Sequence, residues 1–220
     1  SRNTSVGTNA GDSFSGTTTD NTLIGYDAGT AITSGDKNTA VGSYALDDNT
    51  TANNNTAVGY NALTANTTGT NNTAIGGEAL LAATTANSNT AVGKEAAKAI
   101  TTGAENTVLG GSALLTNTTG TQNVAVGYEA LQLSTTSGNN TAVGHRALEN
   151  TTTGADNTAV GRNALDANTT ASYNTAVGSI ALDANTTGSN NTAVGYGALT
   201  TNTTASNSVA FGKSALGANT

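Results

Sequence analysis

The sequence predicts an all-β protein, a parallel β-solenoid of about thirteen coils of 17 residues each, with residues 1–220 forming a single repeat array. Two observations predict this fold. A glycine that closes a phrase such as TAVG recurs thirteen times, and after one interval of 18 residues every interval is 17. The hydrophobic content is only 35%, which suits thin stacked coils better than a thick central core. The recurring glycines are Gly7, Gly25, Gly42, Gly59, Gly76, Gly93, Gly110, Gly127, Gly144, Gly161, Gly178, Gly195 and Gly212.

Each coil begins with a short strand, the phrase NTAVG, as in residues 55–59. We count positions from the recurring glycine, which is position 0. Alternate side chains of a strand point to opposite faces, so Thr at −3 and Val at −1 share one face and Ala at −2 has the other. Both faces accept larger apolar residues, at Val124 and Val108 respectively. We therefore expect both faces to be buried, with the Ala column, at Ala57 and Ala159 for example, meeting another copy of the chain.

The other recurring residues have backbone or packing roles. Asn stands at −4 in twelve of thirteen copies, with Ser208 the exception, and stacked Asn side chains can form an amide ladder. The glycine at 0 predicts a positive φ or a close approach by a neighbouring backbone. Ala at +3 in every copy and Leu at +4 in ten indicate an interior of fixed volume. In the NTTG turn, Gly69 and Gly103 alternate with Ala52 and Ala86 at +10, so that position requires a small residue more than a positive φ.

Charged residues occupy a separate set of positions. All 21 fall at +1, +2, +5 or +6, or in the two positions before the recurring Asn. These variable positions are predicted to form the solvated rim of each coil. The net charge is −7 and no basic stripe is present, so nucleic acid is not an expected partner. The apolar runs are a few residues long, far short of the roughly 20 that span a bilayer, so no membrane insertion is expected in this segment.

The sequence predicts no enzyme and no cofactor, and no catalytic, cofactor-binding or metal-binding residue. The single His145 sits in a variable position beside Arg146, with no repeated acid or nucleophile near it. There is no Cys, and calcium-binding β-rolls need Asp at fixed places in each turn, whereas Asp is sporadic in this chain. The sporadic aspartates include Asp12, Asp36, Asp166 and Asp183.

Two features leave other binding functions open. Thr stands at +8 in twelve copies, from Thr33 to Thr220, and usually again at +9, which gives paired Thr ladders spaced by about 4.8 Å. Such ladders resemble those of ice-binding solenoids, although Thr is also a common turn and strand residue whose hydroxyl bonds locally. The chain also carries N-glycosylation motifs, so glycosylation is a second open possibility. These motifs include Asn54, Asn66, Asn71, Asn117, Asn168, Asn185, Asn190 and Asn202.

The repeated NTAVG, followed by a small residue and a turn, and NSVAFG at 207–212 resemble the head-domain repeats of trimeric autotransporter adhesins. Similar arrays occur in phage tail-fibre-like repeat proteins. The resemblance covers the whole chain and implies left-handed β-roll coils, a homotrimer around one axis and an extracellular place on a cell or virion surface. It also implies a structural and adhesive role, with a surface receptor or a glycan as partner. The coils here are longer than in that family, and we place the extra length in the ALTANTTG limb.

We therefore expect a fibre segment that extends from a surface and presents binding surface, with an ice-binding solenoid as the alternative. Solenoids normally end in atypical capping repeats. Neither end of this sequence departs much from an ordinary copy, so we also expect an excerpt of a longer fibre that can stack end to end.

Overall fold

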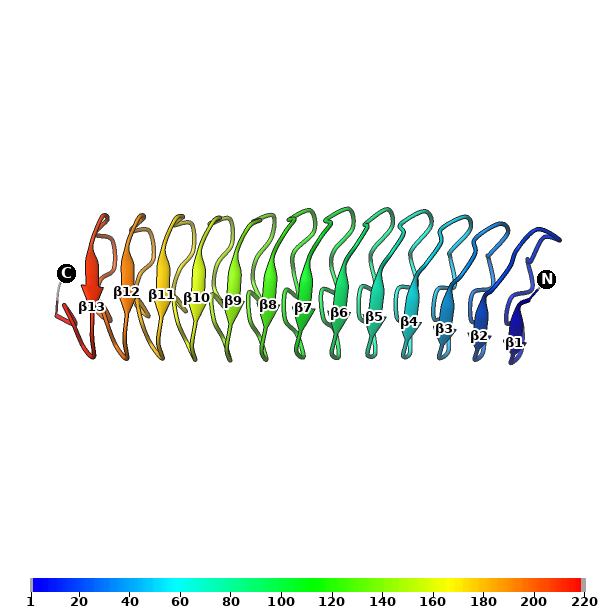
Figure 1. Cartoon of the computed structure of the whole chain (residues 1–220), viewed down its shortest axis with the longest axis horizontal. Coiled ribbons are helices and arrows are strands. Elements are labelled where there is room, and N and C mark those ends of the chain that lie inside the picture. The colour runs from blue at the N-terminus through cyan, green and yellow to red at the C-terminus, as the bar shows by residue number, and fades with distance from the viewer. Residues whose placement is uncertain (1, 219–220) are drawn as a thin grey trace.

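The computed structural model describes residues 2–218, which form a rod of stacked coils with the two ends of the chain at opposite ends (Figure 1). Thirteen strands of three residues pair in sequence order into one parallel sheet. The predicted all-β parallel β-solenoid is thereby confirmed. The strands are β1 (Thr4–Val6), β2 (Thr22–Ile24), β3 (Thr39–Val41), β4 (Thr56–Val58), β5 (Thr73–Ile75), β6 (Thr90–Val92), β7 (Thr107–Leu109), β8 (Val124–Val126), β9 (Thr141–Val143), β10 (Thr158–Val160), β11 (Thr175–Val177), β12 (Thr192–Val194) and β13 (Val209–Phe211).

The register places each residue beside its equivalent in the next coil. Thr56 pairs with Thr73 and Ala57 with Ala74, an offset of 17 residues. The offset is 18 residues only between β1 and β2, where Thr4 pairs with Thr22. Each sequence position is therefore a continuous column of side chains along the rod.

The apolar core is a column of small and medium side chains inside the coils. Ala57, Ala62 and Leu63, at −2, +3 and +4 of one coil, are all 0% exposed and belong to one core cluster that continues through the rod. The expectation that the Ala column meets another copy is therefore wrong, since Ala57, Ala91 and Ala159 are fully buried in their own chain. The narrow coil explains this, because the side chain at −2 faces those at +3 and +4 across it, so −2 is usually Ala. Where Leu23 stands at −2, +4 is Gly29, on which a Cβ would lie 2.9 Å from Leu23.

A second buried column consists of asparagines, and it forms the predicted amide ladder. The backbone N–H of Asn72 donates to Oδ1 of Asn55, 2.9 Å away, and the amide of Asn72 donates to the same oxygen. The Nδ2 of Asn55 in turn donates to the carbonyl oxygen of Gly69, at 2.8 Å. Asn66, at +7 of the same coil, donates to that carbonyl at 3.0 Å. Two asparagines thus hold the returning limb of the coil against the start of the strand.

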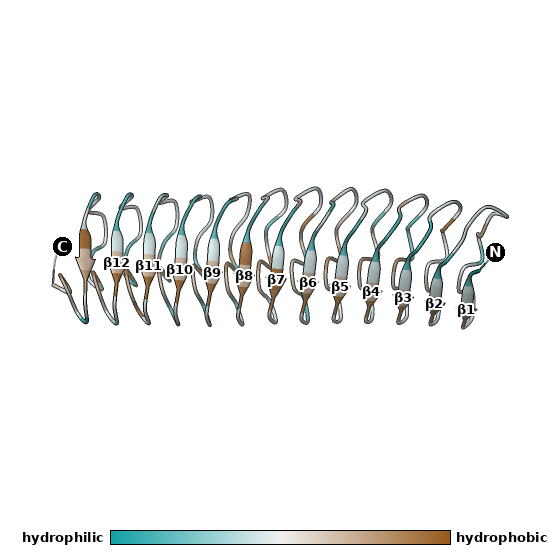
Figure 2. Ribbon diagram, in the orientation of Figure 1, coloured by the Kyte–Doolittle hydropathy of each residue, from teal (hydrophilic) through white to brown (hydrophobic). Residues whose placement is uncertain are grey.

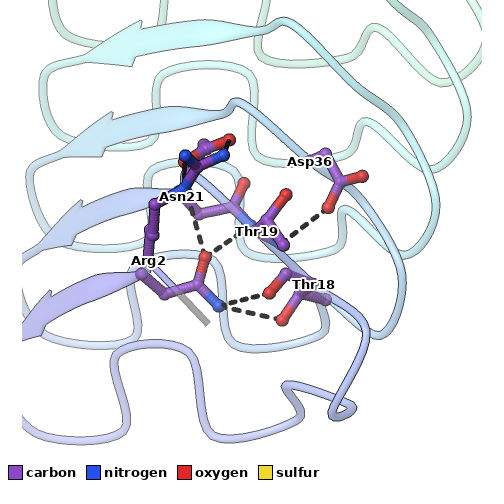
Figure 3. A network of polar contacts seen from close by, with 7 residues as sticks. Arg2, Thr18, Thr19, Asn21 and Asp36 are labelled. Atoms are coloured by element: carbon purple, nitrogen blue, oxygen red, sulfur yellow. Dashed lines mark hydrogen bonds and ion pairs between the residues drawn. The ribbon is translucent and has the colours of Figure 1, made fainter.

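The ladder begins in the first, longer coil (Figure 3). Asn3 donates to the backbone oxygen and the hydroxyl of Thr18, and its Oδ1 accepts from the backbone N–H of Asn21. The backbone N–H of Thr19 donates to Asp36 at 2.7 Å. The first coil has one extra residue, and these polar side chains keep it hydrogen-bonded to the next coil in the same stack.

The glycines at position 0 meet both predicted requirements. Gly127 has φ of 134°, and a Cβ placed on it would lie 2.5 Å from the carbonyl oxygen of Gly144 in the next coil. At +10 the requirement is for small size, as predicted: Gly69 has no positive φ, yet a Cβ there would lie 2.2 Å from the carbonyl oxygen of Ala86. From Gly35 to Ala205, each Ala or Ser at +10 follows a glycine in the coil before it.

Residues other than glycine adopt the left-handed backbone conformation at three corners of each coil, a feature that the sequence pattern does not predict. Residues at +2, +4 and +12, such as Asn61, Leu63 and Asn71, have φ between 53° and 60°. A non-glycine residue in this conformation costs roughly 1–2 kcal/mol. Each of these residues directs its N–H along the rod to a carbonyl of a neighbouring coil, as Leu63 does to Ala79 at 3.0 Å. Hydrogen bonding between coils therefore offsets the cost of the corners.

The amide ladder predicts that asparagines at −4 and +7 differ in importance. Asn55→Ala removes the acceptor of the Asn72 backbone N–H in a buried site, so it should lower the free energy of unfolding by roughly 3 kcal/mol. Asn66→Ile should change it by less than about 1 kcal/mol, because Ile32 and Ile100 occupy the same position and are 0% exposed. Thermal unfolding followed by circular dichroism measures both, and equal losses would contradict this account.

The glycine column predicts a similar contrast. Gly127→Ala introduces both a clash and an unfavourable φ, so it should cost roughly 3 kcal/mol and lower the melting temperature by about 10 °C. Gly77→Ala is the matched control, because a Cβ there meets only the Tyr60 carbonyl oxygen at 3.9 Å and no positive φ is required. A normal melting temperature for Gly127→Ala would show that the coils can separate to admit a methyl group.

Candidate functional surfaces

Residues 2–218 form no pocket and contain no group of three or more His, Cys, Asp or Glu side chains placed to hold a metal ion. The same part of the chain contains no helix with the length and hydropathy to cross a bilayer. The columns of side chains on the outer surface of the rod are the surfaces it offers to a partner. Four features of that surface are distinct in chemistry: the charged rim, the outward face of the sheet, a double row of threonines and the exposed glycosylation motifs.

The charged rim, formed by positions +1, +2, +5 and +6, contains ion pairs between neighbouring coils. Lys98 lies 2.6 Å from Glu78 in the preceding coil and 3.3 Å from Glu95 in its own. Arg146 repeats this geometry with Glu129 at 2.8 Å and Glu149 at 3.4 Å. Half-exposed pairs of this kind contribute little to stability, so the rim is a solvated surface that also links adjacent coils.

One part of the rim is electrostatically unfavourable. Glu149, Asp166 and Asp183 occupy +5 in three consecutive coils and therefore lie in one column. Burial raises the pKa of Asp166 to about 6, and the charge of Glu149, a hydrogen bond with Glu149 and the charge of Asp183 act in the same direction. Oδ1 of Asp166 is buried and has no hydrogen-bond partner. Burial, and then the acidic groups in the coils on either side, thus raise the pKa of Asp166 and disfavour its ionisation.

The single histidine packs against an aromatic ring. His145 is exposed and stacks on Tyr128 of the preceding coil, with ring centroids 5.8 Å apart and planes inclined by 24°. The neighbouring Arg146 pairs with the two glutamates described above. His145 therefore has a packing role within the rim, and these contacts bring no nucleophile to it.

The outward face of the sheet, which we call the Thr/Val face, consists of the side chains at −3 and −1. The Thr column is half-buried along most of its length. The apolar column beside it is exposed by 40% at Ile24, 39% at Ile75 and 36% at Val160. Figure 2 shows the hydrophobic colour recurring at the same level of successive coils. The charged residues all occupy other positions, so this face presents an uncharged, partly apolar strip along the rod.

The paired threonines at +8 and +9, which we call the double threonine row, differ in their hydrogen bonding. The hydroxyl of Thr67 at +8 donates to the backbone oxygen of Thr84 in the next coil at 3.1 Å, and nine other threonines of this column do the same. The threonines at +9, such as Thr68, are exposed, and their hydroxyls have no hydrogen-bond partner among residues 2–218. The last member of the +8 column, Thr220, lies outside the described residues.

The glycosylation motifs divide into two groups by burial. The asparagines at +12 are exposed: Asn54, Asn71 and Asn190. Those at +7 are buried, and each Nδ2 donates to a backbone carbonyl oxygen, so the folded chain cannot accept a sugar there. The buried group is Asn66, Asn117, Asn168, Asn185 and Asn202. The motif has the same form at +7 and at +12. The position of its asparagine within the coil decides whether that asparagine is buried or exposed.

Comparisons with protein-family models, with curated proteins and with solved structures found no match for this chain.

The acidic column predicts a specific pH dependence. Because the pKa of Asp166 is raised to about 6 in the folded chain from an ordinary value of 3.8, the folded state binds more protons than the unfolded state between these values. The stability should therefore fall as the pH rises through this range, and the full penalty is present above about pH 6. Asp166→Asn should raise the melting temperature at pH 8 and leave it nearly unchanged at about pH 3.5.

A second variant changes the acidic neighbour of Asp166 in the preceding coil. Glu149→Gln removes a neighbouring charge that raises the pKa of Asp166, so it should weaken the pH dependence without abolishing it. A melting temperature of Asp166→Asn that follows the wild type at every pH would show that this column is fully solvated.

Proposed function

We propose that the chain is a segment of a structural and adhesive extracellular fibre that assembles with further copies of itself. In this proposal the coils are left-handed and three chains share one axis, as in the adhesin heads that the sequence resembles. The fibre extends from a cell or virion surface and presents its variable rim to a receptor or a glycan.

The exposed apolar column of the Thr/Val face is the observation that carries the assembly proposal. Parallel sheets are normally covered on both faces, whereas a single chain leaves this face half-exposed along all thirteen strands. A contiguous exposed apolar strip on a soluble protein is typical of an interaction site. A copy of the same chain supplies a matching strip with the same spacing and no charge, so the two can pack over their full length.

The shape of the rod and the distribution of its charges support the display role. Thirteen strands spaced by about 4.8 Å extend over roughly 60 Å, with every coil built alike inside. The rim at +1 and +2 changes from coil to coil, as from Tyr60 to Gly77 to Lys94. A regular interior with a more variable rim lets the scaffold keep its geometry while its surface chemistry differs along the rod.

Assembly through the Thr/Val face can be tested by adding charge to it. Val58→Glu, Val92→Glu and Val160→Glu, combined in one chain, would bury unpaired charge in the interface, so the assembly should dissociate into folded single chains. Light scattering coupled to gel filtration gives the mass, which should be a multiple of 21.4 kDa for the wild type and 21.4 kDa for the variant.

Two further variants make the result specific. Ala57→Glu, Ala91→Glu and Ala159→Glu on the same strands should unfold the chain, because these side chains are 0% exposed. Asn61→Glu, Ser112→Glu and Ile180→Glu add the same charge at +2, where Glu already stands in other coils, and should leave the mass unchanged. A wild type of 21.4 kDa would reject the proposed assembly.

A further inference from the structure

The threonines at +9 form an exposed column whose uniformity the fold does not explain. They are Thr51, Thr68, Thr85, Thr102, Thr119, Thr136, Thr153, Thr170, Thr187 and Thr204, one in each of ten consecutive coils. Other exposed positions vary freely: +12, three residues further along, contains Lys, Asn, Ser, Glu, Gln, Asp and Tyr. Position +9 is Ser34 in the coil before these and Thr in all ten that follow, although its side chains point to solvent.

No hydrogen bond of these hydroxyls within residues 2–218 explains threonine at +9. The ten threonines at +8 from Thr33 to Thr186 use their hydroxyls to bond a carbonyl of the next coil, and this bond accounts for threonine at that position. At +9 the hydroxyls bond nothing within the described chain. Turn propensity alone would admit Ser, Asn or Asp equally well at an exposed turn position. The uniformity points to something outside the chain that contacts every coil in the same way.

The surface formed by these threonines restricts what that ligand can be. The hydroxyls at +9 both donate and accept, their methyl groups are apolar, and the half-exposed threonines at +8 lie directly beside them. No charged residue occupies either position, so the ligand is neutral. No aromatic residue lies in either position to stack on a sugar ring, since the tyrosines all stand at +1, +2 or +12. The ligand must also repeat along the rod, because the threonines recur at the coil spacing of about 4.8 Å.

The rigidity of the ligand distinguishes an ordered crystal lattice from a flexible polymer, the two kinds of neutral ligand that repeat along the rod. A single water-mediated contact to a hydroxyl is weak and immobilises a water molecule at a cost of up to about 2 kcal/mol. The water molecules of a crystal lattice are already immobilised, so contacts to them do not carry this entropic cost. Ten equally spaced contacts on one rigid rod then act together. A flexible chain would instead be ordered one unit at a time. We propose that the double threonine row is an ice-binding surface, which contacts ordered water of the crystal through the hydroxyl and methyl groups at +9 and +8.

This site is separate from the Thr/Val face, because it is made of different columns of the coil, +8 and +9 in place of −3 and −1. The proposed assembly leaves the double threonine row available, so ice binding does not depend on the oligomeric state. A fibre that carried this row along its length would attach its source to ice or limit the growth of ice crystals around it.

The test uses the whole chain and measures thermal hysteresis and the shape of ice crystals grown in its presence. The wild type should show a freezing point below its melting point and faceted crystals. Thr68→Lys, Thr119→Lys and Thr170→Lys, combined, should abolish both effects while the circular dichroism spectrum and melting temperature stay unchanged, because these side chains make no internal contact through their hydroxyls.

The matched control places the same charges three residues further on in the same coils. Asn71→Lys, Gln122→Lys and Tyr173→Lys change exposed residues at +12, a position where Lys37 already stands, and should retain the hysteresis. Absence of hysteresis and crystal shaping in the wild type would overturn the proposal. So would hysteresis that survives the threonine substitutions, or retention of the wild type on crystalline cellulose or chitin but not in growing ice.

Discussion

The hydrogen bonds made by the buried asparagine at −4 are the constraint on which the rest of this rod depends. The asparagine at −4 donates to the carbonyl at +10 of its own coil, as Asn55 does to Gly69, and in five coils an asparagine at +7 donates to the same oxygen, as Asn66 does. The first of these asparagines also accepts the backbone N–H of its equivalent in the next coil. One side chain thus closes its own coil and fixes the spacing to its neighbour. An unpaired polar group in this dry interior would be costly, so the ladder admits only one register.

That register explains the remaining features of the coil. Because equivalent backbones stack directly, a side chain at position 0 would collide with the carbonyl of the next coil, and glycine is the residue that fits. Because each backbone N–H must find a carbonyl along the rod axis, three corners adopt the left-handed conformation even where Leu63 or Glu95 stands. The cost of these left-handed residues is offset because each coil forms hydrogen bonds with the coils on both sides. The stability of such a stack resides mainly in contacts between neighbours, as in other repeat proteins.

The regular stacking of the interior also sets the spacing of side chains on the outer surface. Each outer column is a row with a constant spacing, so a single residue type repeated in a column becomes an extended surface of uniform chemistry. The apolar column of the Thr/Val face and the threonines at +9 are two such surfaces on different parts of the coil, whereas the charged rim varies. Only the uniform rows are suited to a partner that itself repeats, whether another copy of the chain or a crystal lattice.

The sequence alone determined the period, the parallel stacking, the amide ladder and the two glycine requirements, because each leaves one residue, or one residue size, at the same position of nearly every coil. Asn72, Gly127 and the small residues at +10 are examples. It also separated charged from uncharged columns. It could not decide which face of a three-residue strand points inward, since Ala at −2 and Thr and Val at −3 and −1 are all compatible with burial. Only the tertiary structure placed Ala57 in the core and left the Val column outside, because that choice depends on the width of the closed coil. The same is true of the threonines, since adjacent residues of one type separate into a bonded and a free row only when the turn of the coil directs one hydroxyl to the next coil and the other to solvent.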